Sequence, residues 1–77
     1  MNNVKILYWI RWFSNEASRL EEELNTNFDK ILIKLEEGRT GQFTVLFNDK
    51  KIYNKIKLIG RLPKPMEITE IINKASK

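Results

Sequence analysis

The sequence predicts an α/β two-layer sandwich, in which two helices pack on a four-stranded mixed sheet in the order β-α-β-β-β-α. Two observations lead to this fold class. Four short segments alternate apolar and polar residues as strands do, and two other segments repeat their apolar residues at the spacing of a helix. The chain has 77 residues, so we expect a single domain over residues 1–77.

The amino-terminal half predicts a strand, a helix and a second strand. Residues 3–9 are β-branched and aromatic in character, and apolar side chains on both faces indicate a central strand. Ser14 is the expected N-cap of a helix over about residues 15–27, with Glu16 in its first turn. Residues 31–36 alternate again and predict a second strand, parallel to the first and joined to it by a right-handed crossover. The apolar face of the helix consists of Ala17, Leu20, Leu24 and Phe28.

The carboxyl-terminal half predicts a hairpin and a closing helix. Residues 42–47 and 51–58 form its two antiparallel strands, and residues 48–50 supply the turn. Gly60 and two prolines interrupt regular structure before a last helix that is marked by Ile68, Ile71, Ile72 and Ala75. In this order, the elements predict a sandwich of the thioredoxin type.

The positive charge is concentrated in one segment. The formal net charge is +4, and residues 49–64 alone carry six basic residues and one acidic residue. Alternation along the strand would place Lys51, Tyr53, Lys55 and Lys57 on one face, and such a stripe favours an anionic partner such as nucleic acid. The candidate anion-binding residues are Lys50, Lys51, Tyr53, Lys55, Lys57, Arg61 and Lys64. The alternative interpretation is that the lysines are solvated and protect an edge strand from aggregation.

The composition excludes several kinds of chemistry. The chain contains no cysteine and no histidine, so it lacks a thiol nucleophile, a thiolate zinc site and the usual general base. The serines have no visible activating partner and the glutamates lack calcium-loop spacing, so we expect no catalytic residue, no metal site and no cofactor. No stretch approaches the ~20 apolar residues that span a bilayer. We therefore expect a cytoplasmic protein that is a monomer or a weak homodimer.

Both tryptophans of the chain lie in the segment YWIRWF, residues 8–13, where the first strand meets the first helix. Trp and Tyr are enriched at protein interfaces, and an arginine between them can stack on a ring or pair with an acidic group. Trp9, Arg11, Trp12 and Phe13 are therefore candidate residues for binding a protein partner. The alternative is that the tryptophans turn inward to enlarge a small core.

The order and spacing of several short motifs resemble those of the selenoprotein W-like, or Rdx, family of small thioredoxin-like proteins. The matching segments are VKILY, TGQFTV, FND and GRLP. In that family the first strand runs into a Tyr-Cys-x-x-Cys motif, or its selenocysteine version. The resemblance therefore implies a thioredoxin-like fold, with a redox motif at the place that YWIRWF occupies here.

The chain departs from the family at that motif. Aligning the first strand places Trp9 and Trp12 on the two chalcogen positions, whereas aligning the helix places Tyr8 and Arg11 there. Neither alignment gives a sulfur, and an indole cannot form a nucleophilic thiolate. We therefore expect a redox-inactive protein that is not an enzyme and that binds another protein through the aromatic segment. A small basic nucleic-acid-binding module is the alternative.

Overall fold

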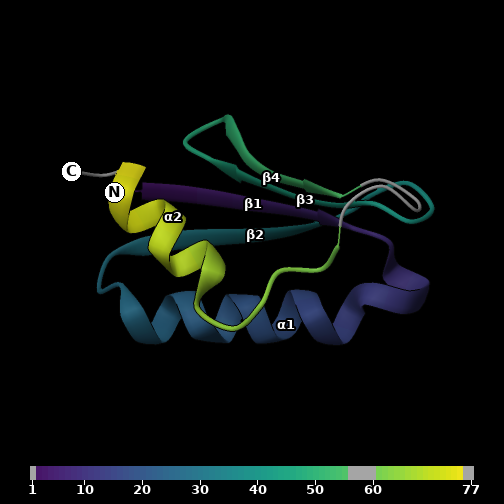
Figure 1. The fold of residues 1–77 in the computed structure, drawn as a ribbon, viewed down its shortest axis with the longest axis horizontal. Helices are drawn as coiled ribbons and strands as arrows, with labels where there is room; N and C mark the ends of the chain where they lie inside the picture. Colours follow the sequence, from purple (N-terminus) through teal and green to yellow (C-terminus); the bar gives the residue numbers. More distant parts are fainter. Residues whose placement is uncertain (1, 56–60, 76–77) are drawn as a thin grey trace.

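The structure is a computed structural model that describes residues 2–55 and 61–75. These residues form six elements in the predicted order β-α-β-β-β-α, which confirms the predicted fold class (Figure 1). The elements are β1 (Asn2–Tyr8), α1 (Ile10–Asn27), β2 (Ile31–Glu37), β3 (Phe43–Phe47), β4 (Lys50–Lys55) and α2 (Glu67–Ala75).

The four strands form one sheet in the order β2-β1-β3-β4, so β1 is central, as its apolar residues on both faces predicted. β1 pairs in parallel with β2, and α1 forms the crossover between them. β1 pairs antiparallel with β3, and β3 pairs antiparallel with β4. The hairpin turn is made by Asn48 and Asp49, whose φ angles of 50° and 69° are the positive values that a two-residue turn requires.

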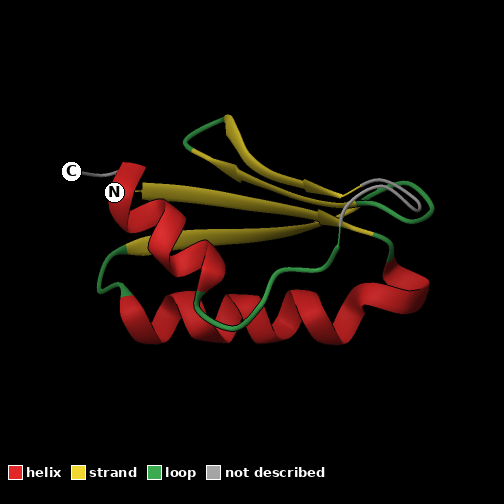
Figure 2. Ribbon diagram, in the orientation of Figure 1, coloured by secondary structure: helices red, strands yellow, loops and turns green. Residues whose placement is uncertain are grey.

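One face of the sheet forms the core together with both helices. Val4 and Ile6 of β1 pair with Phe47 and Val45 of β3, so the four side chains lie on the same face. The helices form one layer and the sheet the other (Figure 2). The buried cluster between them consists of Val4, Ile6, Ala17, Leu20, Leu24, Phe43, Val45, Phe47, Ile68 and Ile72.

The start of α1 differs from the prediction. Ser14 is not the N-cap and Glu16 is not in the first turn, because α1 begins at Ile10 and no acidic residue lies in its first turn. Trp9 is the N-cap and makes no side-chain capping hydrogen bond. The Ser14 hydroxyl instead donates to the carbonyl of Ile10 at 2.5 Å. The prediction was wrong because the aromatic segment is itself helical: the N–H of Phe13 already donates to the carbonyl of Trp9 at 2.8 Å.

β4 differs from the regular strand that was expected over residues 51–58. The later part of that segment, which includes Lys57, lies outside the described residues. The pairing of β3 with β4 changes register between Val45 and Leu46, so Ile52 is the extra residue of a β-bulge.

The bulge separates lysines that were expected on one face. Tyr53 pairs with Val45, which is buried in the core, whereas Lys51 pairs with Leu46 on the opposite face. The prediction that Lys51, Tyr53 and Lys55 share a face was therefore wrong, because strict alternation holds only for a strand without a bulge.

Candidate binding site at the aromatic turn

The candidate site is the aromatic turn, defined here as residues 9–13, which connects β1 to the regular part of α1. Two hydrogen bonds tie the start of this connection to the loop between β2 and β3. The N–H of Trp9 donates to the carbonyl of Gln42 at 2.9 Å, and the N–H of Gly38 donates to the carbonyl of Tyr8 at 2.8 Å. The turn and the loop therefore form one end of the molecule, the right-hand end in Figure 1.

A chain of aromatic contacts runs from the surface of the turn into the core. The rings of Trp12 and Trp9 lie 6.1 Å apart, centroid to centroid, with an angle of 47° between their planes. Trp9 contacts Phe13 edge to face at 5.9 Å, and Phe13 contacts Phe43 in the same way at 6.2 Å. Such tilted and edge-to-face arrangements are the favourable ones for aromatic pairs. We call these four rings, Trp12, Trp9, Phe13 and Phe43, the aromatic ladder. Because Phe43 is fully buried, the ladder anchors the surface rings to the core.

The two ends of this aromatic ladder differ in exposure. The Trp12 side chain is 64% exposed, Trp9 is half-buried, and Phe13 packs against the core cluster. A distortion of the helix accompanies this change, because Phe13 has φ −115° and ψ 15°, outside the helical range. The first turn of α1 is thereby offset from the rest of the helix, and its outermost indole points away from the core.

Of the four candidate protein-binding residues, Arg11 and Trp12 are exposed, Trp9 is half-buried and Phe13 lies underneath the others. The sequence analysis missed Ile10, which is 45% exposed in the same helical turn. The sequence did offer one signal, because Ile10 is an apolar residue within the aromatic segment. Since the helix was expected to begin only after Ser14, Ile10 fell in a connection whose exposed side could not be predicted.

The loop that supports the turn is held by the Gln42 side chain, which sequence reasoning also missed. Its Oε1 accepts from the N–H of Arg39 at 2.8 Å, and its Nε2 donates to Oγ1 of Thr44 at 3.0 Å. Thr44 in turn donates to Oδ1 of Asn54 at 2.6 Å. Gly38 lies close to this side chain, since a Cβ at this position would lie 2.7 Å from Oε1 of Gln42 and 3.0 Å from the backbone nitrogen of Tyr8.

The described residues of the candidate anion-binding set do not gather on one surface. Lys51 pairs with Leu46 on the face of the sheet opposite the core, whereas Lys50 and Lys55 pair with Phe47 and Phe43 of the core face. Nζ of Lys55 lies 5.1 Å from the centroid of the Phe13 ring. This last distance is within the range of a cation–π contact.

The remaining members of this set hold the segment before α2. Arg61 forms two hydrogen bonds with the Glu67 carboxylate, at 2.8 and 2.9 Å, and the backbone N–H of Lys64 donates to the same carboxylate at 2.9 Å. The Arg61 hydrogen bonds hold the pKa of Glu67 below its usual value. The Tyr53 hydroxyl donates to the carbonyl of Arg61, and burial raises the pKa of Tyr53. The contacts of Arg61 and Tyr53 are thus intramolecular.

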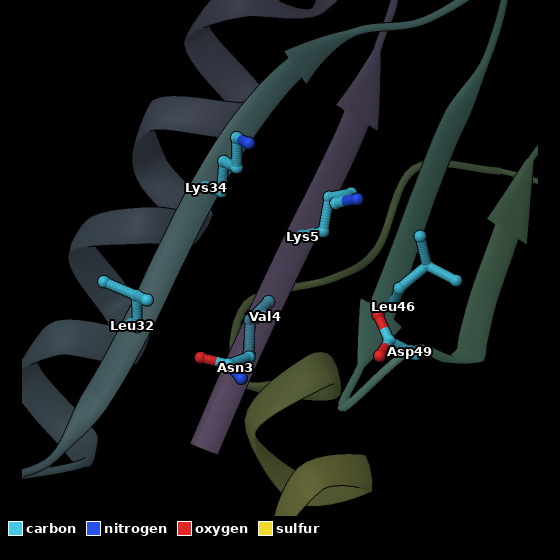
Figure 3. A pocket seen from close by; sticks show the side chains of 7 residues that line it. All are labelled: Asn3, Val4, Lys5, Leu32, Lys34, Leu46 and Asp49. Carbon is cyan, nitrogen blue, oxygen red and sulfur yellow. The ribbon is translucent and has the colours of Figure 1, made fainter. Parts of the chain in front are cut away.

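The face of the sheet opposite the core also has a recess. A pocket of about 270 Å³ lies over β1, β2 and β3, with α1 behind the sheet in Figure 3. Two of the lysines on this face share one carboxylate: Nζ of Lys5 and Nζ of Lys34 lie 3.7 and 3.5 Å from the carboxylate oxygens of Glu36. The pocket is lined by Asn3, Val4, Lys5, Leu32, Lys34, Leu46 and Asp49.

Within residues 2–55 and 61–75, no group of three or more histidine, cysteine, aspartate or glutamate side chains is arranged to hold a metal ion. The helices among these residues are too short or too polar to cross a bilayer.

The fold and the site together define a thioredoxin-like protein whose first helix begins with aromatic side chains and whose sequence has no cysteine. The chain belongs to the Rdx family, whose model matches residues 4–74. This match confirms the resemblance that the sequence motifs indicated.

Two solved structures show the same fold. One is a selenoprotein W-related protein from Vibrio cholerae, with 19% sequence identity and a TM-score of 0.87 over 99% of this chain and 98% of that one. The other is a protein from Bordetella parapertussis, with 17% identity and a TM-score of 0.82 over 96% of both chains. A search among curated proteins finds no significant match.

Proposed function

We propose that this Rdx-family chain is a protein-binding module without thiol redox activity, and that the aromatic turn is its binding surface. The observation that carries this proposal is the position of Trp12, whose indole is 64% exposed at the outer end of the aromatic ladder. Ile10 and Arg11 extend the exposed surface in the same helical turn.

The ladder makes this surface suitable for recognition. The Trp12 ring contacts Trp9, which is connected through Phe13 to the buried Phe43, so the indole is supported and loses little conformational freedom when a partner covers it. Tryptophan and arginine are the residue types that most often dominate binding energy at interfaces. A supported indole beside an arginine therefore supplies the features of an interface anchor.

Redox chemistry of the family type is chemically unavailable to this chain. Thiol–disulfide exchange requires a thiolate that attacks a disulfide sulfur, and the sequence contains no cysteine. What remains at the start of α1 is an apolar and cationic surface, which supports binding rather than exchange.

The test compares Trp12→Ala with Arg19→Ala, which changes another exposed residue of α1 two helical turns away. Each protein is used as bait in nuclease-treated host lysate, and captured proteins are then purified and titrated by calorimetry. We expect at least one protein that binds the wild type and Arg19→Ala but loses about tenfold or more in affinity for Trp12→Ala. Equal affinities of all purified candidates for the wild type and Trp12→Ala would contradict the proposal.

Nucleic-acid binding through the basic hairpin is the alternative, and it has less support. A stacking platform needs an accessible ring, but Tyr53 is half-buried and its hydroxyl is bonded to the carbonyl of Arg61. Titration of labelled single-stranded oligonucleotides at two salt concentrations tests it directly. Affinity that falls steeply with salt and survives Trp12→Ala would favour this alternative.

A further inference from the structure

The charged residues around the aromatic turn are mostly basic. The basic residues are Arg11 in the turn, Arg39 in the loop between β2 and β3 and Lys55 at the end of β4, and the acidic residues are Glu37 at the end of β2 and Glu16, one helical turn after Trp12 in α1. We propose that the partner segment recognised by the aromatic turn is acidic, with carboxylates beside an apolar side chain. This inference rests on the proposed function and specifies the chemistry of the partner.

The backbone brings Arg39 to the turn although 27 positions in sequence separate it from Trp12. The loop is tied to both β1 and the turn by the hydrogen bonds of Gly38 and Gln42, and the N–H of Arg39 is fixed by Oε1 of Gln42 at 2.8 Å. The side chain of Arg39 is exposed, and none of the ion pairs in the described part of the chain involves it.

Lys55 approaches the turn from the end of β4, the strand at the edge of the sheet. It pairs with Phe43 across the β3–β4 hairpin and places Nζ 5.1 Å from the centroid of the Phe13 ring. The end of the molecule that carries the aromatic ladder thus also carries cationic residues of β4, of the loop and of the turn itself. A carboxylate next to the exposed indole would be attracted by all three, because unit charges near a protein surface interact appreciably over several ångströms.

Two acidic residues, Glu37 and Glu16, oppose this field, but they are fewer than the three cations. Glu37 pairs with Tyr8 at the end of β2, Glu16 lies one helical turn after Trp12, and the first turn of α1 contains no acidic residue. The described residues at this end therefore carry an excess of positive charge, and electrostatic complementarity favours an acidic partner.

The geometry favours a peptide over a nucleic acid. Single-stranded nucleic acids require several accessible rings along a cationic groove. In the ladder only Trp12 is largely exposed, and Lys51 lies on the opposite face of the sheet from Lys50 and Lys55. A short segment with one apolar anchor and flanking carboxylates matches this arrangement of one exposed indole and three nearby cations.

The experiment is a selection of random peptides displayed on phage against the immobilised protein, with counter-selection on Trp12→Ala. Selected peptides are then synthesised and titrated against the wild type, Arg39→Glu and the control Arg19→Glu, in which an exposed arginine distant from the turn carries the same change. Circular dichroism verifies that each variant is folded.

We expect the turn-dependent peptides to be enriched in Asp and Glu next to an apolar residue. Their affinity should fall about tenfold or more with Arg39→Glu, change little with Arg19→Glu, and weaken as salt is raised. Turn-dependent peptides without acidic enrichment, or equal effects of the two arginine variants, would overturn this inference and leave the proposed function standing. A selection that yields no peptide sensitive to Trp12→Ala would count against both. A labelled oligonucleotide that binds the turn more tightly than the peptides would also overturn the inference.

Discussion

From the aromatic ladder we predict that its two ends contribute very differently to stability. The variants Trp12→Ala and Phe43→Ala test this difference. A tryptophan offers roughly 250 Å² for burial. With 64% of Trp12 exposed, about one third of that area is hidden. At about 25 cal/mol per Å², the hidden area corresponds to at most about 2 kcal/mol, and the compactness of real unfolded chains reduces this toward 1 kcal/mol.

The opposite end of the ladder is fully buried, since Phe43 has no exposed area. Truncating such a phenylalanine to alanine costs about 3–5 kcal/mol through lost burial and the cavity that remains. Because a chain of this length is stable by only about 4–12 kcal/mol, Phe43→Ala should remove much of the total.

Urea denaturation of the wild type and both variants, followed by far-UV circular dichroism, measures these two costs. A loss for Trp12→Ala equal to that for Phe43→Ala would refute the reasoning, because it would mean that the Trp12 indole is packed in solution. Trp9→Phe, which leaves Trp12 as the sole tryptophan, gives an independent check: its fluorescence should be red-shifted and strongly quenched by acrylamide.

Three further predictions concern other features of the molecule. Glu67→Gln should lower the free energy of unfolding at neutral pH, because Arg61 lowers the pKa of the Glu67 carboxyl in the folded state. The difference from the wild type should vanish as the pH falls from about 4.5 through that lowered pKa, and urea titrations across this pH range measure it. Gly38→Ala should displace the Gln42 side chain and speed hydrogen exchange at the Trp9 amide, while unchanged exchange would show that the loop does not support the turn. The wild type should reduce insulin no faster than buffer does, and sustained turnover would contradict the assignment of a redox-inactive protein.

The sequence was sufficient for the order of the elements because each strand or helix carries its own apolar period. Phe43, Val45 and Phe47 alternate as expected and all three are buried, and Ile68 and Ile72 recur at helical spacing and face the core. Such patterns depend only on neighbouring residues, so they can be recognised without knowing which elements pack against each other.

The features that sequence reasoning missed depend on contacts between distant segments. The bulge at Ile52 shows itself only in the pairing of β4 with β3, and the Gln42 side chain acquires its role only when Gly38 and Thr44 come near it. The start of α1 was missed for a related reason. Ser14 followed by Glu16 is a local signal for the start of a helix, but the aromatic residues before it form a helical turn in which Phe13 packs on Phe43, and this packing overrides that signal.

The exposure of Trp12 is informative because this domain has so little core. A chain of 77 residues buries only roughly 60% of its unfolded surface, so each large apolar side chain in its interior adds substantially to stability. The positions that fill the interior beneath the turn are already taken by Phe13 and Phe43. Trp12 instead contacts Trp9 and leaves most of its surface exposed, so much of its apolar area is not buried on folding. An exposed indole with rigid support and cationic neighbours gains most of its favourable burial only when a partner covers it, which is why we infer recognition from this end of the molecule.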